Sequence, residues 1–229
     1  MMISSGAMPR QKAAVVAGSV ILAMAALAGY AYGFVFNSLV VPGDAAATVQ
    51  HIKASSLLFR SSILAWMMVL ACDVLAAWAL YYLLEQVNRP LSLLMAWARL
   101  VYAVMLGSAI LNLNAIPLLL DSAAAQNTEA QVMLFIRQFQ TAWSAALLLF
   151  GLHLLLLAYL AFRSGYIPVI WSVLLAIAGL SYLGVHTAEL LFPKYAASIK
   201  TVETLLSVPM AAAEIGLGIW LLVRGRTVL

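Results

Sequence analysis

Residues 145–162 read AALLLFGLHLLLLAYLAF, an apolar run in which His153 is the one side chain that titrates near neutral pH. A run of this length is close to what an α-helix needs to cross the hydrocarbon core of a bilayer. Working outward, the run extends over residues 130–163, and five further apolar runs fill most of the 229-residue chain. Hydrophobic residues make up 66% of the sequence and charged residues 9%, too few to cover the surface of a water-soluble fold. The sequence therefore predicts an all-α, polytopic transmembrane helix bundle.

We expect a tail of residues 1–12 followed by one membrane domain, residues 13–229, with six spanning helices. The expected spans cover residues 13–37, 60–85, 91–120, 130–163, 167–192 and 202–223. The first run follows two basic residues, as a signal peptide does, but it is too long for one and indicates a retained helix. Between the first two spans, residues 43–53 are typical of a short capped helix lying in the membrane interface. This helix is either a spacer between the two spans or a lid over an outward-facing cavity.

Basic residues in the connections predict the orientation of the bundle, because positively charged loops stay on the cytoplasmic side. Alternate connections carry the basic residues Arg10, Lys12, Arg89, Arg163, Arg224 and Arg226. The connections at the opposite side mix acids and bases, namely Lys53, Lys194 and Lys200 with Asp44, Asp121 and Glu129. We therefore expect both termini to face the cytoplasm.

Several classes of function are disfavoured by the polar residues. A single cysteine, Cys72, excludes a disulfide framework and a multi-thiolate metal site. The two histidines His153 and His186 lie about 10 Å or more apart along the membrane normal, too far to ligate one haem. His186 and Glu189 form only an isolated i, i+3 pair of potential ligands. Scattered basic residues do not favour nucleic acid. We expect no metal, no cofactor and no nucleic-acid partner, and membrane lipids as the surroundings.

Four ionisable residues on four different spans fall at similar depths from the cytoplasmic ends, about 12 to 19 Å by helix rise. They are Asp73, Arg99, His153 and Glu214. Ionisable groups are costly in lipid, so they normally face the bundle interior and find partners. We expect Arg99 to pair with Asp73 or Glu214, and Tyr102 and His153 to add hydrogen-bonding groups. Two interpretations stay open: an ion-pair clasp that fixes helix order, and a ligand-binding or proton-handling site at the inner end of a cavity.

A second set of polar residues is expected nearer the outer leaflet. The candidates for an outer vestibule are Arg60, Asn114, Arg137, His186 and Glu189. Arg60 and Glu189 lie close enough to the interface to reach water instead, whereas Arg137 is deeper.

The first helix carries a ridge of small residues, Ala25, Gly29 and Gly33, at four-residue spacing. Such a ridge lets another helix approach closely in lipid. The partner helix belongs either to the same chain or to a second copy in a homo-oligomer, and the sequence leaves both open.

Several strings, in their order and spacing, resemble the bacterial membrane-protein family catalogued as domain of unknown function 4386. They include residues 42–48 (PGDAAAT), 58–60 (LFR), 87–89 (VNR), 99–102 (RLVY), 151–157 (GLHLLLL), 163–168 (RSGYIP) and 191–193 (LFP). The resemblance runs from about residue 13 to near the C-terminus and implies six to seven helices in the bacterial cytoplasmic (inner) membrane. It implies no activity, substrate or cofactor. The candidates within the matching strings are Arg60, Asp73, Arg99, Tyr102, His153 and Glu214, whereas His186 and Glu189 lie where the pattern differs.

The sequence predicts a protein that binds or transports a small amphiphilic or polar molecule, in a polar cavity between the second, third, fourth and sixth spans. The alternative is an intramembrane enzyme acting on a lipid or isoprenoid, with Asp73, His153 and Glu214 exchanging protons. The chain shows no nucleophile elbow and no phosphate-binding loop, which disfavours an enzyme. A second alternative is a scaffold or sensor subunit that binds another membrane protein through the first helix.

Overall fold

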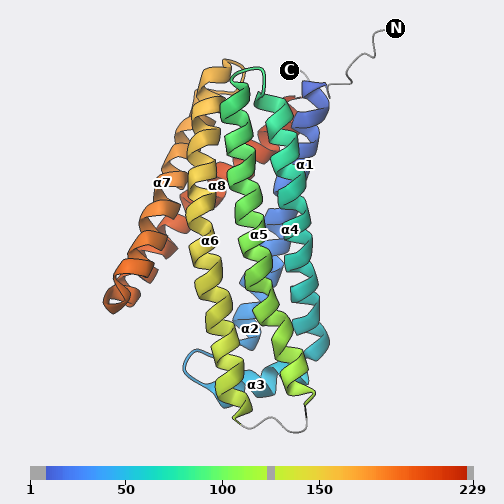
Figure 1. The fold of residues 1–229 in the computed structure, drawn as a ribbon, viewed down its shortest axis with the longest axis vertical. Helices are drawn as coiled ribbons and strands as arrows, with labels where there is room; N and C mark the ends of the chain where they lie inside the picture. The colour runs from blue at the N-terminus through green and yellow to red at the C-terminus, as the bar shows by residue number, and fades with distance from the viewer. Residues whose placement is uncertain (1–8, 123–126, 226–229) are drawn as a thin grey trace.

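A computed structural model describes residues 9–122 and 127–225, and these residues are almost entirely helical, with no strand among them. The elements are α1 (Arg10–Ala28), the π-helical stretch η1 (Gly29–Phe36), α2 (Asn37–Leu39), α3 (Ala45–Ala54), α4 (Ser56–Leu84), α5 (Arg89–Leu120), α6 (Thr128–Ser164), α7 (Val169–Leu191), the 3-10 turn η2 (Pro193–Tyr195) and α8 (Ala196–Val223). Within the described residues, six helical segments are long and apolar enough to cross a membrane. The predicted polytopic helix bundle with six spanning helices is confirmed (Figure 1).

The ends of the spans differ from the predicted ones by a few residues. The largest difference is at α8, which begins at Ala196 and not near residue 202, because the short turn at Pro193 leads directly into it. At the N-terminus, the first helix already begins at Arg10, three residues before its predicted start at residue 13. Residues 1–8 of the predicted tail lie outside the described part of the chain.

One end of the bundle joins the start of α1 to the turns that follow α4 and α6. The Arg10 guanidinium donates a hydrogen bond to the side chain of Gln86 and lies 5.4 Å from the centroid of the Tyr166 ring. The Tyr166 hydroxyl in turn donates to the carbonyl of Leu83 over 2.6 Å. The last turn of α8 lies at the same end (Figure 1). We call it the basic end, because Arg10, Arg89, Arg163 and Arg224 lie at the helix ends gathered there. Its orientation in a cell remains a prediction.

The short helix α3 lies across the opposite end of the bundle (Figure 1). Its N-cap is Asp44, whose Oδ1 accepts a hydrogen bond from the amide of Ala47 over 2.9 Å. Val49 and Ile52 on its inner face are buried. The predicted capped helix between the first two spans is therefore present, and we call this the α3 end.

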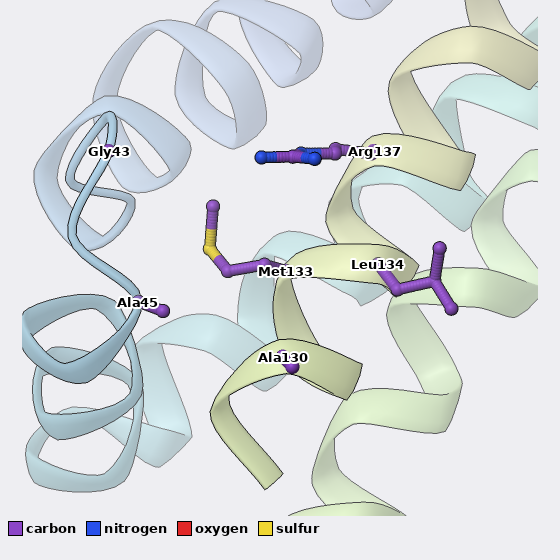
Figure 2. Close-up of a pocket in the computed structure, with 6 residues that line it drawn as sticks. All are labelled: Gly43, Ala45, Ala130, Met133, Leu134 and Arg137. Atoms are coloured by element: carbon purple, nitrogen blue, oxygen red, sulfur yellow. The ribbon is translucent and has the colours of Figure 1, made fainter. Parts of the chain in front are cut away.

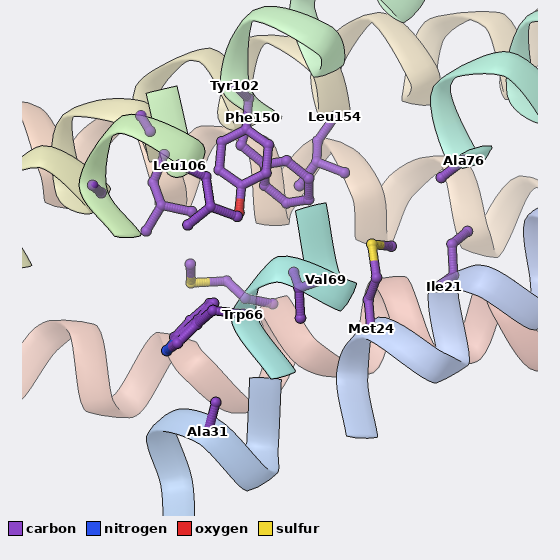
Figure 3. Packing of buried hydrophobic residues seen from close by; sticks show 14 of the residues in the cluster. Ile21, Met24, Ala31, Trp66, Val69, Ala76, Tyr102, Leu106, Phe150 and Leu154 are labelled. Atoms are coloured by element: carbon purple, nitrogen blue, oxygen red, sulfur yellow. The ribbon is translucent and has the colours of Figure 1, made fainter. Parts of the chain in front are cut away.

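The core is one apolar cluster between the longer helices. Met24 of α1, Val69 of α4, Leu106 of α5 and Leu154 of α6 converge in it (Figure 3). Toward the α3 end, the first half of α8 and the adjoining end of α7 diverge from the other helices (Figure 1). Most side chains of residues 190–208 are accordingly exposed.

Two glycine pairs bring helices into close contact. A methyl group at Gly18 of α1 would lie 2.7 Å from the carbonyl oxygen of Gly218 in α8, and one at Gly151 of α6 would lie 3.0 Å from that of Gly179 in α7. The first distance is too short for a side chain and the second is tighter than nearly all such contacts, so these glycines permit the close helix crossings.

The predicted ridge on the first helix makes no such contact. A methyl group at Gly29 or Gly33 would have no neighbour within 4 Å in the described chain. Packing within the chain therefore does not explain these two glycines, and a second copy as their partner remains a prediction.

Candidate functional site

Arg99 of α5 is the centre of a buried ionic cluster. Its Nε and Nη2 lie 3.0 and 2.8 Å from Oδ1 of Asp73 in α4. Its Nη1 lies 3.0 Å from Nε2 of His153 in α6, and Nη2 is 3.6 Å from the sulfur of Met24 in α1. Asp73, Arg99 and His153 are each at most 2% exposed. We call these three residues the arginine clasp.

The protonation state of His153 follows from its two neighbours. Its Nδ1 lies 3.0 Å from the carbonyl oxygen of Met95, which can only accept a hydrogen bond, so Nδ1 carries the proton. Its Nε2 then accepts from the Arg99 guanidinium, as the neutral imidazole does. The negative charge of Asp73 compensates the positive charge of Arg99. The second carboxylate oxygen of Asp73 has no hydrogen-bond partner in the described chain.

Aromatic rings cover the face of the clasp arginine. The Arg99 guanidinium lies 5.3 Å from the centroid of the Phe150 ring. The Tyr102 ring packs against the Phe150 ring at an angle of 45°, with centroids 4.8 Å apart. Phe150 and Tyr102 are both buried. The geometry therefore favours the interpretation of the clasp as an ion pair that holds α4, α5 and α6 together.

Glu214, the fourth residue expected in this layer, does not bond to the clasp. Its Oε1 accepts a long hydrogen bond of 3.4 Å from the Tyr182 hydroxyl of α7. Depth counting concerns only the position of Glu214 along its helix, and it cannot tell which way a side chain points around the helix axis. The structure thus brings together three of the four residues.

The five candidates for an outer vestibule lie at three separate places, so the predicted common vestibule is not what the described structure shows. Arg60 forms an exposed ion pair with Asp121, Nη2 to Oδ2 3.0 Å. Asn114 lines a pocket of about 320 Å³ beside Arg60. His186 and Glu189 lie together on α7, and Arg137 is in a different pocket.

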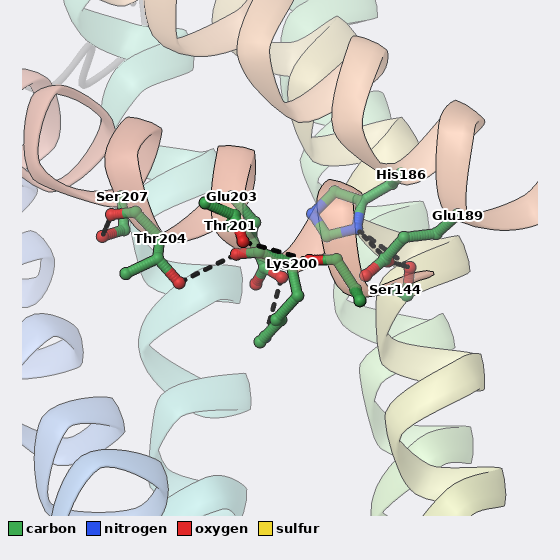
Figure 4. A network of polar contacts seen from close by, with 9 residues as sticks. Ser144, His186, Glu189, Lys200, Thr201, Glu203, Thr204 and Ser207 are labelled. Atoms are coloured by element: carbon green, nitrogen blue, oxygen red, sulfur yellow. Dashed lines mark hydrogen bonds and ion pairs between the residues drawn. The ribbon is translucent and has the colours of Figure 1, made fainter. Parts of the chain in front are cut away.

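Ser144 of α6, which the sequence did not single out, joins His186 and Glu189 (Figure 4). Its hydroxyl lies 2.5 Å from Oε2 of Glu189 and 2.9 Å from Nδ1 of His186, and that same nitrogen is 3.0 Å from Oε2 of Glu189. A hydrolytic Ser-His-acid relay needs the hydroxyl and the carboxylate on opposite ring nitrogens. Here both are on Nδ1, so the group ties α6 to α7 and does not form such a relay.

Arg137 of α6 faces the larger pocket, which has a volume of about 470 Å³ (Figure 2). The pocket lies between the segment that leads into α3 and the first turns of α6. Its lining residues are Gly43, Ala45, Ala130, Met133, Leu134 and Arg137. Arg137 is exposed, and within the described residues it has no acidic or hydrogen-bonding partner. The pocket thus combines an apolar wall with one uncompensated positive charge.

The comparisons with known proteins identify the family but assign no activity. The family model described as Domain of unknown function (DUF4386) matches residues 16–225. The chain belongs to this family. The DUF4386 chain is also 28% identical over 165 residues to a protein of Archaeoglobus fulgidus described as "Uncharacterized protein", covering 72% of this chain and 84% of that one. No solved structure matches it.

Together with the six apolar helices, family membership identifies an integral, multi-pass membrane protein. The relative is archaeal, and location in a bacterial inner membrane remains a prediction.

Proposed function

We propose that this DUF4386 protein binds an amphiphilic molecule of the membrane in the pocket between α3 and α6. The observation that carries the proposal is the pocket itself, about 470 Å³ in volume, with five lining residues that offer apolar surface or backbone and one arginine. Ligand sites of small molecules typically measure about 300–1,000 Å³ and combine apolar walls with a few polar groups. A molecule with an apolar part and a polar part suits such a lining.

The length of α6 supports a location at the membrane surface. Its 37 residues rise over about 55 Å, whereas the hydrocarbon core is about 30 Å thick. A centred α6 therefore extends roughly 12 Å beyond the hydrocarbon at each end. Arg137 lies nine residues after Thr128, the first residue of α6, or about 14 Å along the helix. This count supports a position of the guanidinium near the boundary between lipid headgroups and acyl chains.

The arginine clasp argues for binding over transport. A route through the bundle centre would have to separate Asp73, Arg99 and His153, which are buried and bonded to one another. Breaking a buried ion pair costs several kcal/mol, typically about 3–5. The pocket at the α3 end needs no such rearrangement, because it is already open to ligand.

Filling the pocket tests the proposal. Ala130→Trp places an indole in the space between α6 and α3, and we expect native mass spectrometry of protein extracted in mild detergent to show loss of bound lipid or fatty acid. The matched control is Ala71→Trp, because Ala71 is an exposed alanine of α4 outside the pocket lining. The control variant should retain the ligand carried by the wild type. Equal retention by both variants would contradict the proposal.

A further inference from the structure

We infer that the pocket holds a membrane phospholipid and that Arg137 binds its phosphate. This inference rests on the proposed function and assigns the chemical class of the ligand. The molecule is identified by three features: an unpaired guanidinium, its height on α6, and two acids that each precede a lining residue in the chain.

The first feature is the lack of an ion-pair partner for Arg137 among the described residues. The other two arginines that lie in spanning helices away from the basic end are both paired. Arg60 is paired with Asp121, and Arg99 is held in the clasp. Arg137 has no such partner among residues 9–122 and 127–225. A guanidinium presents a planar fork of N–H donors that matches a phosphate, often through two parallel hydrogen bonds. The oxyanion that Arg137 lacks within the chain can therefore come from a lipid.

The second feature is the direction in which the pocket residues are arranged. Ala130, Met133, Leu134 and Arg137 follow one another along a single face of α6, at spacings of three and four residues. Met133 and Arg137 project toward the segment that holds Gly43 and Ala45 (Figure 2). Since Arg137 is the member farthest from the start of α6, it lies on the side of the pocket nearer the bilayer centre.

A phospholipid fits this order with its phosphate at Arg137. Its acyl chains would continue from Arg137 toward the bilayer centre. Its terminal headgroup would enter the space between Ala130 and Ala45. A free fatty acid has a carboxylate for Arg137 but no group to occupy that space.

The third feature is the charge around the headgroup space. Asp44 and Glu129 adjoin the lining residues Ala45 and Ala130 in the chain. The carboxylate of Asp44 caps α3, and Glu129 is exposed in the first turn of α6. These acids would repel a second negative charge and attract an amine. A zwitterionic lipid is therefore the appropriate probe.

The experiment compares dioleoylphosphatidylethanolamine with dioleoylglycerol, which has the same acyl chains and no phosphate. Binding of each to purified protein in detergent is measured by native mass spectrometry titration for the wild type, Arg137→Gln and Arg60→Gln. We expect Arg137→Gln to weaken binding of the phospholipid about tenfold or more, since a hydrogen-bonded charged group contributes that much to affinity. Arg60→Gln removes an exposed arginine from the same end of the bundle and should leave the affinity unchanged.

Each remaining outcome is decisive. Equal affinity of the wild type for dioleoylglycerol and the phospholipid, or an unchanged affinity in Arg137→Gln, overturns the phosphate assignment. Preferential binding of oleate, titrated in parallel, overturns it in favour of a free carboxylate. If Ala130→Trp abolishes binding of every probe while Arg137→Gln affects none, the pocket is a ligand site and only the assignment to phosphate fails. If Ala130→Trp affects no probe, the proposed function itself fails.

Discussion

The two ends of this bundle differ in how tightly their helices pack. In the half nearer the basic end, Gly151 of α6 lies against Gly179 of α7, where a methyl group would be 3.0 and 2.9 Å, respectively, from the opposite carbonyl oxygen. Toward the α3 end, Gly184 of α7 and Gly29 on the first helix have no neighbour within 4 Å in the described chain. Helix α7 therefore packs closely on α6 in one half and diverges from the bundle with α8 in the other (Figure 1), and the larger pocket lies toward that other end.

The same difference separates the two arginines Arg99 and Arg137. Arg99 is 2% exposed and bonded to Asp73 and His153, whereas Arg137 is exposed and unpaired in the described structure. The same side chain thus holds helices together where it is buried and paired, and presents an unpaired positive charge where it is exposed. Environment, and not residue type, decides between a structural and a binding role for a charge in a membrane protein.

Removing the acid of the clasp should have the largest effect. Asp73→Ala leaves the Arg99 charge buried without compensation, and we expect a loss of about 3–5 kcal/mol in the free energy of unfolding. Thermal unfolding in detergent measures it. The control is Asp121→Ala, which removes the acid of the exposed pair with Arg60 and should cost no more than about 1 kcal/mol. Equal effects of the two changes would show that the buried Asp73–Arg99 pair contributes no more to stability than the exposed Arg60–Asp121 pair does.

The imidazole of the clasp is expected to contribute less. His153→Phe keeps an aromatic ring but removes the acceptor of the Arg99 Nη1 hydrogen bond, which should cost about 1.5–3 kcal/mol. Melting temperature in detergent again reports the loss, while lipid binding in the α3–α6 pocket should be unchanged. The enzyme alternative predicts the reverse: a bundle of normal stability that has lost a catalytic activity.

The tight glycine crossing provides a third test. Gly151→Leu forces a side chain against the carbonyl oxygen of Gly179, and such overpacking costs about 1–3 kcal/mol. Gly184→Leu is the matched change in the open half and should be neutral or slightly stabilising, because leucine favours a helix more than glycine does. Comparable melting temperatures for the two variants would contradict the inference that α7 packs more tightly at Gly151 than at Gly184.

The sequence was sufficient for the six spans and for the clasp pair because both depend on position along the helix axis. Hydrophobic length predicts a span, and counted depth places Asp73 and Arg99 at heights that an arginine side chain can bridge. Neither hydrophobic length nor counted depth tells how a helix is rotated about its axis or which helices it packs against. Arg99 pairs with Asp73, one of the two partners expected for it, whereas Glu214, counted at a similar depth, bonds to Tyr182 of α7.

The same limitation explains the outer residues. Arg60, His186 and Arg137 were grouped by depth, yet they lie at separate places on α4, α7 and α6. Arg60 pairs with Asp121 and His186 with Glu189, whereas Arg137 lines the larger pocket. Ser144 carried no signal, because a single serine in an apolar helix usually satisfies itself on its own backbone. The pocket beside Arg137 depends on where α3 packs, which a linker sequence does not specify.

The smallest effect on stability is expected from the open arginine, and it is the most direct test of the comparison. Arg137→Gln removes a charge that no described residue compensates, so the free energy of unfolding in lipid-free detergent should change by no more than about 0.5 kcal/mol. The matched change Arg99→Gln leaves Asp73 buried without its partner and should cost several times as much, about 3–5 kcal/mol. Adding phosphatidylethanolamine should then stabilise the wild type more than Arg137→Gln, because a ligand that binds only the folded state raises its stability. Equal costs for the two glutamine variants without lipid would mean that the protein itself holds the Arg137 guanidinium, and a charge already satisfied within the chain would have no reason to recruit a phosphate.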